Sequence, residues 1–160
     1  MTCIVFGSSM GNTEKAASVI AEKIKDETRL VNVTDMTMET FKDCSTVLLG
    51  SSTWGVGDLQ DDWESKIDLL KTINLSGKKV GFFGCGDQEM YPDSFVSALG
   101  TLYEAVKGTV DNIIGKWPIS GYSFTNSAAV VDDYFIGLAL DEDNQPELTG
   151  SRIEEWVSTL

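Results

Sequence analysis

The chain of 160 residues carries 25 acidic and 12 basic side chains and no histidine, which gives a net charge of −13 at pH 7. Binding to a nucleic-acid backbone or to an anionic membrane needs clustered Lys and Arg, so this composition argues against both partners. The length suits one domain spanning residues 1–160. We expect a monomer whose protein partners have basic surfaces, although plain solubility would also explain the acidity.

The cysteines and the start of the chain bear on the cellular compartment. Cys3, Cys44 and Cys85 have no metal-ligand spacing, and their number is odd. The first residues enter an apolar strand directly, without the charged segment and apolar stretch that mark a signal peptide. No apolar run is long enough to span a membrane. We therefore expect reduced thiols and a cytoplasmic location.

The first motif is the segment VFGSSMGNTE, in which a strand over Thr2–Phe6 leads through a turn into a helix over Asn12–Asp26. The start of a helix offers free backbone N–H groups and the positive end of the helix dipole, and Ser8, Ser9 and Thr13 add hydroxyl donors. The Lys-Ser/Thr ending of an ATP-binding P-loop and the G-x-G-x-x-G sequence are both missing. The turn therefore predicts a site for a phosphomonoester, with an ordinary helix cap as the alternative.

Strands and helices alternate along the rest of the chain, which is typical of a parallel sheet covered by helices on both faces. Further strands are predicted at Leu30–Val33, Thr46–Gly50, Lys79–Gly84 and Asn112–Ile119. Apolar residues at helical spacing predict helices over Gln60–Lys71, over Ser94–Val106 with Asp93 as its N-cap, and over Thr149–Thr159. The polar stretch Ser120–Asp133 interrupts the last strand, which resumes over Tyr134–Leu140. The predicted fold is α/β, a doubly wound five-stranded parallel sheet with an insertion in its last strand.

Two further loops carry aromatic residues at the carboxyl ends of predicted strands. Trp54 lies within Ser51–Leu59, and Tyr91 lies within Cys85–Ser94. In a doubly wound sheet the loops after the first, third and fourth strands converge at the ligand site. The two rings could therefore enclose a flat aromatic ligand, while the glycines beside them let backbone N–H groups approach it. The alternative is that both rings only cover the end of the sheet.

The three loops together, SSMGNTE, TWGVGDL and GCGDQEMYPDSF, resemble in order and spacing those of flavodoxins, the small FMN-containing electron carriers. The tail from GYSF through GLALDEDNQ is similar to the long-chain branch, whose fifth strand carries an inserted loop. The resemblance spans the whole chain. It implies the strand order 2-1-3-4-5 and a non-covalently bound FMN.

Motif positions assign the binding residues. The FMN phosphate would be surrounded by Ser8, Ser9, Met10, Gly11, Asn12 and Thr13. The remaining site residues come from the two aromatic loops and are Ser52, Thr53, Trp54, Gly55, Val56, Gly57, Cys85, Gly86, Asp87, Tyr91 and Ser94. Trp54 and Tyr91 would lie on opposite faces of the isoalloxazine, with Asp87 at its pyrimidine end. The chain departs from the family at Met10, where a hydroxyl residue is usual, and at Cys85, where Thr is frequent.

The resemblance implies an electron-transfer protein, not an enzyme, in which FMN cycles between semiquinone and hydroquinone. No Lys or Arg occurs at 50–64 or 81–105, where acidic residues gather near the loops. Their negative charge disfavours the anionic hydroquinone and predicts a low potential. One alternative is an FMN-dependent NAD(P)H:quinone or disulfide reductase, which would need an open face of the flavin. Another is a flavin-free receiver domain, but Ser8 and Ser9 stand where such domains have paired acids.

Overall fold

The computed structural model describes residues 1–160 and is built on a seven-stranded sheet. Its parallel part has the spatial order β2, β1, β3, β5, β10, formed by Thr28–Asn32, Thr2–Gly7, Thr46–Trp54, Lys79–Cys85 and Leu138–Leu140. Two short strands join it, since β4 (Asp58–Leu59) pairs antiparallel with β3 and β6 (Asn112–Ile113) pairs parallel with β5. The predicted doubly wound sheet and its order 2-1-3-4-5 are confirmed, with β5 and β10 as the fourth and fifth strands.

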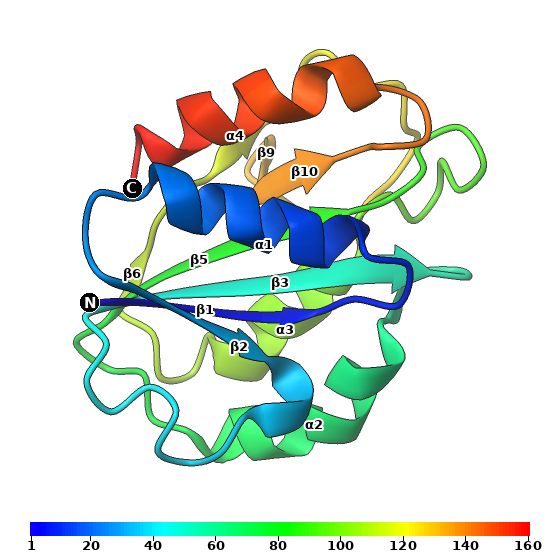
Figure 1. Cartoon of the computed structure of the whole chain (residues 1–160). Helices are drawn as coiled ribbons and strands as arrows, with labels where there is room; N and C mark the ends of the chain where they lie inside the picture. The colour runs from blue at the N-terminus through cyan, green and yellow to red at the C-terminus, as the bar shows by residue number, and fades with distance from the viewer.

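Helices cover both faces of the sheet (Figure 1). Helices α1 (Asn12–Lys23) and α4 (Thr149–Val157) lie on one face, and α2 (Asp61–Thr72) and α3 (Ala98–Val106) lie on the other. Each helix buries one apolar stripe against the sheet, for example Ala16, Ala17 and Ile20 in α1. The 3-10 turns η1 (Val33–Asp35) and η2 (Pro146–Leu148) follow β2 and precede α4. The carboxyl ends of β1, β3 and β5 meet at the right-hand edge in Figure 1, away from both chain termini.

Several element boundaries differ from the sequence prediction for local reasons. Helix α1 ends at Lys23, because Ile24 is already extended with ψ 130°. Helix α3 begins at Ala98 and not at Ser94, so the prediction that Asp93 caps it is wrong. Val96 has φ 48°, a left-handed conformation that no helix accommodates, and it interrupts the predicted helical run.

The insertion in the fifth strand is larger than predicted and has its own structure. Both β6 and β10 pair with β5, so the strand is split as expected. Between them, β7 (Trp117–Pro118), β9 (Tyr134–Phe135) and β8 (Val130–Val131) form a separate three-stranded sheet. Residues 117–118 and 134–135 therefore do not extend the fifth strand, contrary to the prediction. Gly115, with φ +70°, turns the chain away from the sheet. A side chain at this position would also collide with the Trp156 indole.

The prediction of three reduced thiols is wrong for two of them. Cys3 in β1 and Cys44 before β3 form a disulfide between Cα atoms 5.8 Å apart. Their separation of 41 residues hides the pairing in the sequence, and the parallel alignment of β1 with β3 brings them together. Cys85 remains a free, buried thiol. The disulfide closes a long loop and restricts the unfolded chain.

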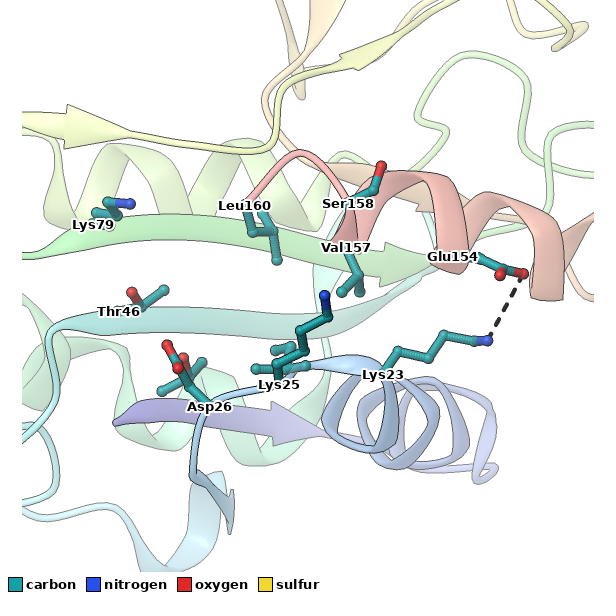
Figure 2. A pocket seen from close by; sticks show the side chains of 11 residues that line it. Lys23, Lys25, Asp26, Thr46, Lys79, Glu154, Val157, Ser158 and Leu160 are labelled. Carbon is teal, nitrogen blue, oxygen red and sulfur yellow. Dashed lines mark ion pairs between the residues drawn. The ribbon is translucent and has the colours of Figure 1, made fainter.

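A cavity of about 570 Å³ lies at the amino-terminal edge of the sheet (Figure 2). It is bordered by Thr46 and Lys79 at strand starts and by the last turn of α4. The ion pair between Lys23 and Glu154 joins α1 to α4 at its rim, with 3.8 Å between Nζ and Oε2. This cavity lies opposite to the converging loops, so its size does not make it the site predicted from the sequence.

Candidate functional site

A second cavity, of about 510 Å³, lies at the carboxyl edge, where the loops after β1, β3 and β5 meet. This is the position that the doubly wound topology predicts for a ligand. Most of the predicted site residues line it, namely Ser8, Met10, Asn12, Thr13, Ser52, Thr53, Trp54, Cys85, Gly86, Asp87 and Tyr91. Met90, which lies within the predicted aromatic loop, also lines it, and so do Glu142 and Asp143, which the sequence analysis did not include.

The loop Ser8–Thr13, which we call the phosphate loop, connects β1 to α1 without any basic side chain. Gly11 has φ +92° and opens the helix, a conformation that glycine adopts without strain. Its N–H donates to the Ser8 hydroxyl over 3.1 Å, which holds the turn closed. Gln60 donates to the Ser9 hydroxyl, so Ser9 lies against α2 and not in the cavity.

Thr13 is the residue that points most clearly to an anion site. Its residue is fully buried, and its hydroxyl has no hydrogen-bond partner although it lies at the start of α1 beside the cavity. A buried hydroxyl without a partner loses about 1–3 kcal/mol relative to one that is satisfied. A phosphate at the helix start would accept a hydrogen bond from this hydroxyl and further hydrogen bonds from the free N–H groups of the first turn. The phosphate loop therefore fits a phosphomonoester.

The two aromatic side chains line the cavity from different loops. Trp54 ends β3 and pairs with Asp58 of β4, so the expected loop is a tight hairpin whose turn is Gly55–Gly57. Its indole N–H donates to the Ser52 hydroxyl over 2.8 Å, which orients a ring that is 41% exposed. Tyr91 is 44% exposed. Both rings are thus available to a flat aromatic ligand, which can bury them further.

The loop Cys85–Ser94, which we call the ring loop, folds around the Asp87 carboxylate. Asp87 Oδ1 accepts from the backbone N–H of Met90 over 2.9 Å and of Glu89 over 3.2 Å. Gly86 donates its N–H to the carbonyl of Leu140 at the end of β10. The loop is therefore anchored to the last strand at one end and turned back on itself at the other.

Comparison with known proteins agrees with this geometry. The model of the flavodoxin family matches residues 4–156. The chain belongs to the flavodoxin family. A flavodoxin of a Synechocystis species is 42% identical over 98% of this chain and 94% of its own length, and flavodoxin 1 of Escherichia coli is 41% identical over 100% and 92%. The crystal structure of a Fusobacterium nucleatum flavodoxin mutant bound to flavin mononucleotide has a TM-score of 0.93 at 30% identity, covering 99% of this chain and 93% of that one.

Family membership identifies the chain as an FMN-based electron carrier and not an enzyme. The alternative of an NAD(P)H-dependent reductase finds no support among these relatives. No helix of this flavodoxin combines the length and the apolar character needed to cross a membrane.

The free thiol of this flavodoxin, Cys85, is unreactive at neutral pH. Burial raises the pKa of Cys85 to about 12, against a smaller opposing effect of the Thr13 hydroxyl, which lies beside the sulfur without hydrogen-bonding geometry. The thiolate is the reactive form of cysteine, and at neutral pH it is scarcely populated here. Cys85 therefore serves as a small apolar wall of the cavity.

Acidic side chains dominate the electrostatics of the flavodoxin cavity. Partial burial opposes ionisation of Asp87, but hydrogen bonds from Met90, Asn144 and Glu89 outweigh it and hold the pKa of Asp87 below its usual value. Burial raises the pKa of Asp143, and the negative charges of Asp87, Asp141 and Glu142 raise it further. The cavity thus holds several carboxylates and no cation.

Some predicted residues lie outside the cavity lining. Gly55, Val56 and Gly57 form the hairpin turn beside it, with the Val56 side chain 87% exposed. Ser94, the last residue of the ring loop, is buried, and its Cβ lies 3.5 Å from the position that a Cβ on Gly57 would take. Glu142 and Asp143 were missed, but their position directly after the last strand was a usable signal, because that strand end joins the same edge of the sheet.

Proposed function

We propose that this flavodoxin carries single electrons at low potential between redox partner proteins with basic surfaces. FMN is held by the phosphate loop and the two aromatic loops, through those motif-assigned residues that line the cavity. The protein acts as a monomeric single domain in the cytoplasm. The observation that carries the proposal is one cavity that combines an unpartnered buried hydroxyl, Thr13, with the two half-exposed rings of Trp54 and Tyr91.

Each part of the cavity has a separate task. The phosphate loop binds the anionic end, and the hydroxyl of Thr13 becomes satisfied when it does so. Trp54 and Tyr91 exclude water from the ring system that supplies the electron chemistry when FMN is bound. The carboxylates of Asp87, Glu142 and Asp143 oppose the accumulation of negative charge in the cavity, which keeps the second one-electron potential low. The same charges attract partners with basic surfaces.

The purified protein tests the proposal directly. We expect flavin absorbance bands, a stoichiometry of one FMN per chain, and much weaker binding of riboflavin, which has no phosphate. Turnover of NADPH with a quinone should stay negligible without a separate reductase. A protein that rejects FMN, or that reduces quinones with NADPH on its own, would contradict the assignment.

Two further measurements address the partners and the assembly. Electron transfer from a reductase with a basic surface should slow as salt rises from about 10 mM to 1 M, because the Debye length falls from about 30 to about 3 Å. Rates that ignore salt would exclude electrostatic steering. Sedimentation should give the mass of one 17.4 kDa chain, and a dimer mass would reject the monomer.

A further inference from the structure

Asp141, directly after β10, is a completely buried carboxylate without a cationic partner. The ion pairs of the chain join Lys23, Lys42, Lys71 and Lys107 to other acids. Asp141 is instead satisfied by amide donors alone. A charge removed from water is costly, and it depends on hydrogen bonds of this kind for its stability.

The donors to Asp141 come from two residues. Gln88 donates its backbone N–H over 3.2 Å and its side-chain Nε2 over 2.7 Å, both to Oδ2. Asn144 donates its backbone N–H to Oδ1 over 3.0 Å, and its Nδ2 reaches Oδ1 and Oδ2 over 3.1 and 2.9 Å. The Asp141 carboxylate thus links the ring loop to the loop after β10 through hydrogen bonds.

The same network reaches the lining of the cavity. Asn144 Nδ2 also donates to Asp87 Oδ1 over 2.8 Å, and Asp87 lines the cavity. Gln88 is buried behind it, and its Oε1 accepts from the backbone N–H of Ser123 in the insertion. Asp141 is therefore connected to Asp87 on the cavity side and to the insertion on the far side.

Only a carboxylate can fill this position. An asparagine has one acceptor oxygen, and its NH₂ group would face the amide donors of Gln88 or Asn144 and leave them unpaired. Unpaired buried donors destabilise the arrangement that creates them. We propose that Asp141 is a positioning residue that fixes the ring loop, and Asp87 in particular, against the flavin ring. The inference rests on the proposed function in that it names a flavin as the ligand.

The test compares Asp141→Asn with Asp111→Asn. Asp111 is an exposed carboxylate that accepts from Ser76 Oγ and Gly77 N–H in a distant turn, so its variant makes the same chemical change elsewhere. In Asp141→Asn we expect amide hydrogen exchange at 86–91 to accelerate at least tenfold, with the amides of β1 and β3 unaffected. FMN and riboflavin should both bind about tenfold more weakly, while inorganic phosphate should bind the apoprotein unchanged.

A second set of variants keeps the proposal testable if Asp141→Asn folds poorly. Asn144→Leu should reproduce the faster exchange at 86–91 and the weaker binding of FMN and riboflavin. Gln88→Leu combined with Asp141→Asn should weaken flavin binding less than the sum of the two single effects, because both act on one contact. Unchanged exchange at 86–91, an equal response in Asp111→Asn, or a loss confined to FMN would overturn the proposal. Failure of the wild type to bind FMN would overturn the proposed function instead, while the exchange rates would still decide whether Asp141 holds the loop.

Discussion

The phosphate loop and the ring loop line one cavity but are held in different ways. The phosphate loop is closed by a bond between neighbours, from Gly11 N–H to Ser8 Oγ, and by the start of α1. The ring loop is held by Asp141, which lies 53 residues away from Gln88 in the chain. The first loop is therefore a local structure of strand, turn and helix. The second depends on tertiary contacts that exist only once the sheet has formed.

The largest expected effect concerns the disulfide that ties β1 to Cys44. It tests whether the phosphate loop, which follows β1, binds its ligand without this long-range link. Reduction of the Cys3–Cys44 disulfide should lower the free energy of unfolding by about 4 kcal/mol, as expected for a loop of this length. The affinity for FMN should not change. Urea unfolding with and without dithiothreitol measures this, and Cys44→Ser, which has no disulfide, should not respond to the reductant. Three titratable thiols in the unfolded, unreduced protein would contradict the disulfide.

The second prediction isolates the phosphate loop. Thr13→Val keeps the shape of the side chain but removes the hydroxyl, so FMN binding should weaken by about 1.5–3 kcal/mol, the usual worth of a hydrogen bond to a charged group. Riboflavin binding should not change, and the apoprotein should be no less stable because its hydroxyl is unpartnered. Fluorescence titration gives both affinities, with the exposed Thr101→Val as the control. An equal loss for riboflavin would mean that Thr13 supports the fold and not the phosphate.

The third prediction concerns the turn between the two aromatic walls. Gly55 has φ +51°, so Gly55→Ala should cost about 1 kcal/mol of unfolding free energy. Gly77→Ala, at φ +77° in open space, should cost about the same. Only Gly55→Ala should lower the first one-electron potential, by roughly 40 mV, the redox equivalent of about 1 kcal/mol, because it destabilises the one-electron-reduced state relative to the oxidised state. If the first one-electron potential were equal in the two variants, the Gly55–Gly57 turn would have no role in setting it.

The smallest effect concerns the charge beside the ring loop. Asp143→Asn removes one carboxylate from the cavity, and at about 10 Å and an effective dielectric of about 40 this should raise the second one-electron potential by roughly 35 mV. Glu147→Gln, which removes an exposed charge outside the cavity, should change it much less.

The pH dependence of the Asp143 effect has a defined sign. Burial and neighbouring acids raise the pKa of Asp143, so its carboxylate becomes neutral at a higher pH than an ordinary aspartate. The difference between wild type and Asp143→Asn should therefore be full at neutral pH and shrink as the pH falls through that raised pKa. Anaerobic potentiometry across acidic pH measures it, and a difference independent of pH would exclude Asp143 as its source.

Local sequence patterns predicted the fold well because apolar strands and amphipathic helices carry their own periodicity. The turn of the phosphate loop was predictable for the same reason, since the hydrogen bond that closes it, from Gly11 N–H to Ser8 Oγ, spans three residues. The contact of Ser9 with Gln60, 51 residues away, was not predictable. The start of α3 was not predictable, because valine rarely adopts a left-handed conformation and nothing in the sequence indicates that Val96 does so. The disulfide and the Asp141 network were also out of reach, because their partners are separated by 41 and 53 residues.

The split fifth strand also affects how the molecule meets other copies of itself. An uninterrupted edge strand presents a row of free N–H and C=O groups on which a foreign strand can add. Here β5 is flanked by pieces of two and three residues, β6 and β10, with the insertion leaving the sheet between them. A row this short and broken is a poor template for strand addition. We therefore expect this side of the sheet to resist strand addition by other copies of the chain, whatever the insertion contributes to the flavin site.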